Sequence, residues 1–238
     1  MSYNDRFLMT TSSSVRRARR TVRALALLLV LSATAQTGTG ADFSAGFMAG
    51  YKGGFTMRVT GGVENFATGF PLGVEAGVGF AWMDPGIPMD ARHVFINDNT
   101  NGTPEETGYA WDIRLDFLYD LKLLKASKTF LFAGVRGSFF TGNFNFVGGN
   151  EDFDVTTEQV GLGGGLKGAF AMGRNIDLVI SLGADYFFPA TLSGHDTSYG
   201  PDGEDVNPRE GYDYDDADAA VNQPKFQPSV LVGVGYRF

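Results

Sequence analysis

The chain has 238 residues, including 33 glycines and 21 phenylalanines but no cysteine, and its formal net charge is −8. This length suits one all-β barrel or a modest two-domain protein, and the lack of cysteine excludes a disulfide framework. Outside the arginine-rich first 23 residues the chain has no basic patch to neutralise phosphates, which argues against nucleic acid as a partner.

The first 35 residues have the three parts of a secretory signal peptide. A basic stretch from Arg16 to Arg23 precedes an apolar run at 24–31 and a small-x-small cleavage site at 33–35. The apolar run is too short for a signal anchor, which needs about 20 residues to cross a membrane. We therefore expect cleavage after residue 35 and a single domain over 36–238. That domain carries 13 basic and 26 acidic residues, a net charge of about −13.

After residue 40, short segments alternate apolar with small or polar residues, which is typical of β-strands. Eight such strands are predicted near 43–51, 55–60, 70–82, 109–121, 131–139, 160–172, 176–188 and 226–238. Short connections at 61–69, 124–127 and 173–175 alternate with longer ones at 84–107, 147–154 and 189–225. Short turns at one end and long loops at the other indicate an outer-membrane barrel. The first strand is the weakest prediction, because the tight link at 52–54 stands where a longer loop is expected.

The composition of the two strand faces decides which of them points outward. A soluble barrel such as a lipocalin would need a polar face dense in lysine and glutamate, but here that face is mostly glycine, alanine and serine. Glycine suits the crowded interior of an eight-stranded barrel. The apolar face carries aromatic residues at both strand ends, as the girdles of membrane barrels do. They are Trp82, Tyr109, Trp111, Tyr186, Phe188 and Phe226 at the loop end, and Phe70, Tyr119, Tyr236 and Phe238 at the turn end.

The last segment, Phe226 to Phe238, ends in Gly235-Tyr236-Arg237-Phe238 and resembles the C-terminal insertion signal of bacterial outer-membrane barrels. Together with the strand pattern and the signal peptide, it makes the chain resemble the small eight-stranded barrels, such as the OmpA transmembrane domain and the OmpX and OmpW families. The resemblance implies an all-β fold, a transmembrane up-and-down antiparallel β-barrel of eight strands in the outer membrane of a Gram-negative-type bacterium. It also implies three partners: outer-membrane lipid and, through the C-terminal strand, the barrel-assembly machinery and periplasmic chaperones.

Charged residues on the inward face predict a salt-bridge network in the lumen, because an unpaired buried charge costs several kcal/mol. Hairpin arithmetic places Arg58 across from Glu75. It likewise places Arg136 across from Asp116, and it brings Asp177 and Arg237 together at the periplasmic end. An ion path or gate is the functional alternative to a sealed core. The full predicted network is Arg58, Glu75, Asp112, Arg114, Asp116, Arg136, Lys167, Asp177, Asp185 and Arg237.

The acidic loop at 189–225 raises the question of a metal site. Asp213, Asp215, Asp216 and Asp218 offer oxygen ligands for Ca²⁺, but the spacing of an EF-hand is absent. The sequence therefore favours a solvated acidic loop and predicts no metal and no cofactor.

The sequence contains few residues suited to catalysis. Lipid-modifying outer-membrane barrels use serine and histidine on a lipid-facing strand, whereas Ser193, His195 and Asp196 follow Pro189 in an expected loop, and His93 lies in another. The glycine run at 161–165 lacks the helix and the Lys-Ser or Lys-Thr pair of a phosphate loop. No catalytic residue is predicted.

These observations predict a non-enzymatic outer-membrane barrel with a polar, salt-bridged interior. Its role is structural or lies in surface recognition, with an extracellular ligand bound at the acidic loops. The alternative is a narrow channel for small or amphipathic solutes.

Overall fold

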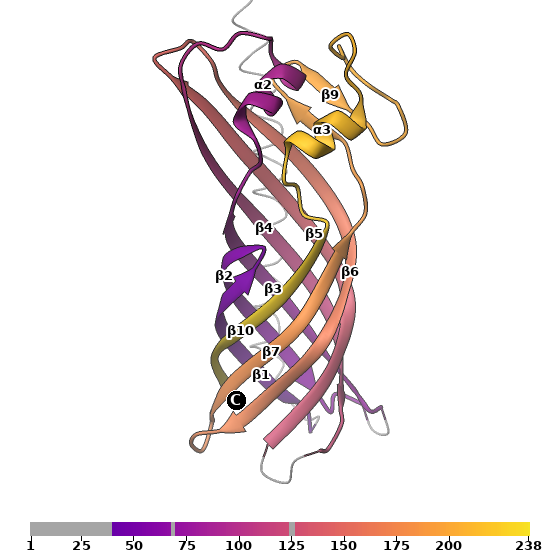
Figure 1. Ribbon diagram of the computed structural model, residues 1–238. Coiled ribbons are helices and arrows are strands. Elements are labelled where there is room, and N and C mark those ends of the chain that lie inside the picture. The colour runs from indigo at the N-terminus through magenta and orange to yellow at the C-terminus, as the bar shows by residue number, and fades with distance from the viewer. Residues whose placement is uncertain (1–39, 68–69, 124–126) are drawn as a thin grey trace, which may run out of the picture. The chain divides into compact units, whose positions relative to one another are not determined.

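The computed structural model describes residues 40–238 except 68–69 and 124–126, so the predicted signal peptide lies outside the described residues. Eight antiparallel strands close a barrel, each paired with the next, and β1 pairs with β10 (Figure 1). All eight predicted strands are confirmed, including the first. They are β1 (Asp42–Lys52), β2 (Gly54–Glu64), β3 (Leu72–Met83), β4 (Thr103–Asp120), β5 (Ser127–Val147), β6 (Asp152–Ala171), β7 (Ile176–Phe187) and β10 (Phe226–Arg237).

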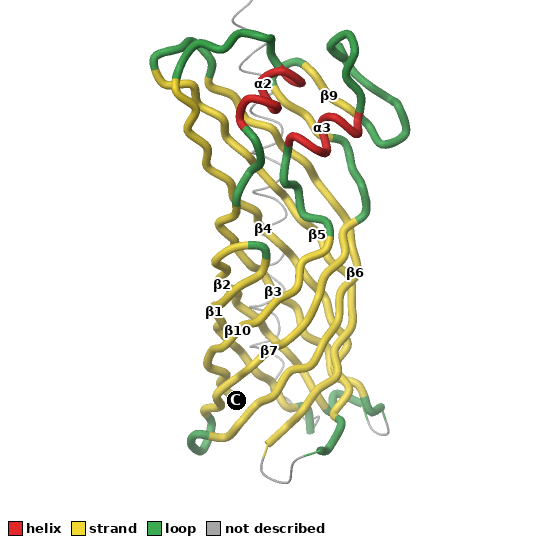
Figure 2. Tube along the Cα trace, viewed as in Figure 1, coloured by secondary structure: helices red, strands yellow, loops and turns green. Residues whose placement is uncertain are grey.

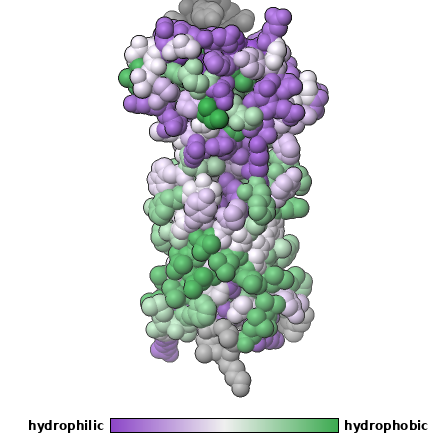
Figure 3. All heavy atoms as spheres, viewed as in Figure 1, coloured by the Kyte–Doolittle hydropathy of each residue, from purple (hydrophilic) through white to green (hydrophobic). Residues whose placement is uncertain are grey.

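The barrel has an apolar outside and a polar inside. Because side chains alternate along a strand, the outward positions of β1, such as Phe47 and Tyr51, are 50% and 57% exposed, while Met48 and Lys52 are buried. In Figure 3, hydrophobic residues gather around the part of the barrel away from the helices, and hydrophilic residues dominate the end that carries them. This arrangement is the reverse of a soluble barrel and matches a wall that faces lipid.

Three strands are longer than the others and extend past the barrel wall. β4, β5 and β6 have 18, 21 and 20 residues, whereas the other barrel strands have 11 or 12. At about 3.4 Å per residue, the longest spans roughly 70 Å, far more than a hydrocarbon core of about 30 Å requires. The far parts of these strands therefore continue as a sheet beyond the other barrel strands (Figure 2).

A cap packs against the inner face of this extended sheet. It consists of the connections at 84–102 and 188–225, with helices α2 (Pro88–Phe95) and α3 (Tyr214–Ala220) and the hairpin of β8 (Leu192–Gly194) and β9 (Thr197–Tyr199). The expectation that these stretches are plain loops is wrong. Neither α2 nor α3 is long and apolar enough to cross a membrane, and no other helix is present in the described part of the chain.

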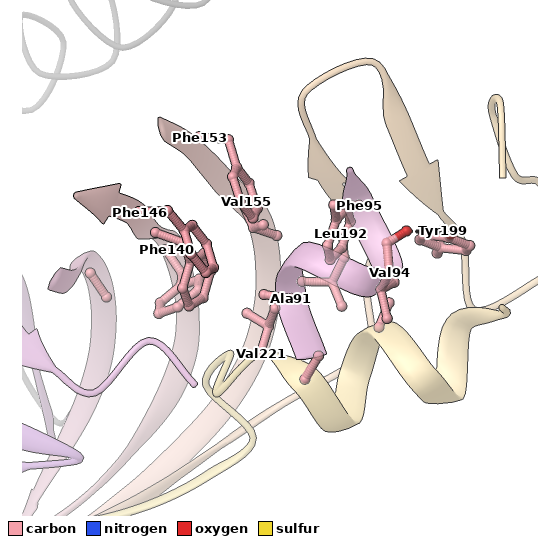
Figure 4. Packing of buried hydrophobic residues seen from close by; sticks show 14 residues of the cluster. Ala91, Val94, Phe95, Phe140, Phe146, Phe153, Val155, Leu192, Tyr199 and Val221 are labelled. Carbon is pink, nitrogen blue, oxygen red and sulfur yellow. Dashed lines mark hydrogen bonds between the residues drawn. The ribbon is translucent and has the colours of Figure 1, made fainter. Parts of the chain in front are cut away.

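Aromatic side chains of β5 and β6 form one hydrophobic core with the cap. Phe140, Phe146 and Phe153 on the sheet are at most 5% exposed, and they share this core with Phe95 of α2 and Tyr199 of β9 (Figure 4). The hydroxyl of Tyr199 donates a hydrogen bond to the Val94 carbonyl at 2.9 Å. Burial of this apolar surface holds the cap on the sheet.

At the end of the barrel that carries the cap, the wall is shortest at the β1–β2 hairpin (Figure 1). Gly53 makes the tight turn of this hairpin at φ +67°. Above this turn, the connections that lead from β3 and toward β10 pair with each other through a bridge between Gly86 and Val221. The Ile87 amide donates to the Ala220 carbonyl at 2.9 Å, which reinforces this bridge. This pairing thus joins the two connections of the cap above the shortest strands of the barrel.

Candidate functional site: the charged lumen and the acidic cap

Seven charged side chains meet at the middle of the lumen, and we call them the central cluster. They are Lys52, Arg58, Asp112, Arg114, Asp116, Arg136 and Asp185, none more than 7% exposed. Arg136 joins two carboxylates: its Nη1 lies 2.8 Å from Asp116 and its Nε 2.6 Å from Asp185. Arg114 Nε also binds Asp116, at 2.6 Å. The cluster thus links β1, β4, β5 and β7 across the barrel.

Lys52 is a member that the sequence analysis missed. The tight 52–54 link assigned it to a turn, but its side chain points into the lumen and is 2% exposed. Its Nζ lies 3.3 Å from Asp112 and 3.0 Å from Asp185. The parity of β1 carries the signal, since residue 52 shares the inward face with Met48.

Two predicted hairpin registers are wrong. Arg58 lies opposite Gly79, and Glu75 lies opposite Gly62, because the β2–β3 connection is centred further along the chain than expected. Arg136 lies opposite Arg114 and not opposite Asp116. Arg136 and Asp116 nevertheless meet, because long side chains reach diagonal neighbours on one face of a sheet.

Glycines on the inward face make room for the cluster. Gly163 lies between Arg136 and Asp185, and a Cβ there would collide with the Asp185 carboxylate and the Arg136 guanidinium. A Cβ at Gly79 would collide with Asp112 in the same way. The glycine run at 161–165 lies within β6, and at Gly163 it allows an ion pair to form between β5 and β7.

Arg58 differs from the other bases of the central cluster. Its side chain is buried, yet no carboxylate in the described part of the chain forms an ion pair with it, and its Nε and Nη2 are without an acceptor. The cluster contains four bases and three carboxylates. Arg58 is therefore the excess positive charge.

Separate ion pairs occupy the end of the lumen near the short turns. Lys167 pairs with Glu75, and Arg237 Nε lies 2.8 Å from Asp177. Asp120, at the rim, accepts a hydrogen bond from the Lys122 amide at 2.9 Å. A cavity of about 50 Å³ lies among the inner pairs, which is room for roughly three waters.

Buried side chains pack in the lumen above the central cluster. Phe140 and Phe187 are 1% and 2% exposed, and the Lys52 ammonium lies 5.3 Å from the centre of the Phe187 ring. The Gln159 amide donates to the carbonyls of Phe188 and Pro224, at 3.3 and 2.8 Å. This layer separates the cluster from the cap.

The outer end of the molecule is strongly acidic. The stretches 84–107, 148–158 and 188–225 contain 18 carboxylates and only three bases, Arg92, Arg209 and Lys225. All three bases contact carboxylates: Lys225 with Asp218 at 2.8 Å, Arg209 with Asp98 at 3.1 Å, and Arg92 with Glu151 at 3.9 Å. Arg92 is fully buried and also donates to the Asn101 carbonyl at 2.7 Å.

The aspartates proposed as Ca²⁺ ligands have structural roles. Asp213 caps α3 by accepting from the amides of Asp215 and Asp216, and the Asp216 carboxylate accepts in turn from the Asp213 amide. Asp218 accepts from Gln223 at 2.6 Å. Across residues 40–238, apart from the two short gaps, no three histidine, aspartate or glutamate side chains are placed to hold a metal ion.

Ser193, His195 and Asp196 lie in and beside the β8–β9 hairpin. His195 sits at its tip with φ +53°, and its Nδ1 lies 2.9 Å from the Asp196 carboxylate. This contact lowers the pKa of Asp196. Ser193 points to solvent from β8 and pairs in register with Ser198 and Thr156.

Comparison with known structures finds similar barrels. A major outer membrane protein from Thermus thermophilus is 29% identical, with 84% of this chain and 100% of that chain covered and a TM-score of 0.68. Neisserial surface protein A (14% identity, 83% and 96% covered) and Ail, the attachment invasion locus protein of Yersinia pestis (12%, 83% and 97%), both give a TM-score of 0.39. No protein-family model and no curated protein sequence matches the chain.

Proposed function

Since this chain belongs to the small eight-stranded outer-membrane β-barrels, we propose that it is a non-enzymatic outer-membrane protein with a sealed barrel and an acidic cap outside the cell. The short turns face the periplasm and the cap faces outward, in the usual orientation of such barrels. The barrel anchors the cap, and the cap acts in recognition or in the structure of the surface layer.

The proposal of a sealed barrel is supported by two sets of buried side chains in the lumen. The central cluster fills the middle of the barrel, and the layer of Phe140, Phe187 and Gln159 fills the space above it. An open ion path would need a continuous polar passage. The cavity at the periplasmic end has room for only a few waters and supports no such passage.

Planar-bilayer recordings test the seal. The refolded protein is expected to give no stable unitary currents under conditions in which a porin conducts. Stable currents would instead favour a narrow channel for small or amphipathic solutes, the alternative function. Gel migration that changes on boiling provides the control for folding, because a closed barrel resists detergent until it is heated.

An acyl-release assay tests the absence of catalysis. Ser193 on β8 and His195 at the tip of the β8–β9 hairpin are both exposed, and the contact between His195 and Asp196 involves adjacent residues. We expect the wild type to release no more acyl chain from lipid A or phospholipid than the Ser193→Ala variant. Release that disappears in this variant would establish an enzyme.

A further inference from the structure

We draw no further inference here: the strongest candidate, the exposed edge of β4 at residues 103–107, which pairs with β5 on one side and with no strand of the described part of the chain on the other, carries nothing, because nothing in the structure shows what covers it.

Discussion

Lys52, at the tip of the β1–β2 hairpin, forms an ion pair with Asp185 of β7, with Nζ 3.0 Å from Oδ2. The same ammonium lies 3.3 Å from Asp112 of β4. One buried cation thus links the β1–β2 hairpin to β4 and β7 across the lumen.

Replacement of Lys52 by methionine should destabilise the barrel strongly. The change leaves the carboxylates of Asp112 and Asp185 buried without this cation, and loss of one partner of a buried pair costs about 3–5 kcal/mol. Urea unfolding in lipid vesicles measures the free energy. Lys128→Gln is the control, because Lys128 pairs with Glu64 at a partly exposed site and should contribute at most about 1 kcal/mol.

Replacement of Arg58 by methionine should have the opposite result. Arg58 is the excess base of the central cluster, without a carboxylate partner in the described residues. A hydrophobic side chain of similar size removes the cost of burying its charge, so stability should be unchanged or should rise by about 1–4 kcal/mol. The same unfolding experiment decides the point. A loss as large as that of Lys52→Met would show that Arg58 has a stabilising partner.

These two residues show what the sequence alone can predict about the lumen. Period-two alternation assigns Arg58 to the interior correctly, because one buried face is a local property of the strand. Its neighbours depend on the register, which depends on where the turn is centred, and the pattern at 61–69 does not determine that. Lys52 was missed because the end of the first strand could not be located. A turn residue and the last residue of a short strand have the same local sequence pattern.

The cap could not be predicted from local sequence patterns, for a different reason. Phe144 and Phe153 alternate with Asn143, Asn145, Asp152 and Asp154, so the sequence predicts a loop at 147–154 and not the continuation of two long strands. Their burial depends on Phe95 and Tyr199, which are about 50 residues away along the chain in either direction. Only the tertiary contact shows that these aromatic residues form a core.

Gly163→Ala should disrupt the ion pair between Arg136 and Asp185. The added methyl group has no space beside the Asp185 carboxylate and the Arg136 guanidinium, and overpacking alone costs about 1–3 kcal/mol. Gly173→Ala is the matched control, because a Cβ at Gly173 meets no atom within 4 Å and should change stability by no more than about 0.5 kcal/mol. Equal unfolding free energies for the two variants would contradict the packing argument.

The cap should lose stability at alkaline pH because of Tyr199. Burial raises the pKa of this tyrosine above its ordinary value of 10.0. An acid with a raised pKa in the folded state stabilises the fold below its unfolded pKa, and this contribution is lost as the pH rises through the folded pKa. Limited proteolysis of the cap above pH 10 should therefore become faster.

The Tyr199→Phe variant isolates this effect. It loses the hydrogen bond to the Val94 carbonyl and the one that the hydroxyl accepts from the Arg209 amide, so its cap should be less stable at neutral pH. Its further loss of stability in alkali should be smaller than that of the wild type. Part of the loss should remain, because burial raises the pKa of Tyr214 as well. An identical alkaline response in both proteins would exclude Tyr199 as the titrating group.

The two tryptophans of the chain should report the outer edge of the lipid-facing wall. Trp82 and Trp111 are both 49% exposed, and both pack against Phe80, with ring centres 4.6 and 4.9 Å apart. Tryptophan prefers the interface between hydrocarbon and headgroups. In vesicles, lipids brominated near the headgroup should quench the fluorescence more than lipids brominated near the chain ends. Trp82→Phe and Trp111→Phe, each with one tryptophan left, should show the same order. Strong quenching by aqueous iodide with little effect of brominated lipid would mean that this face of β3 and β4 is in water.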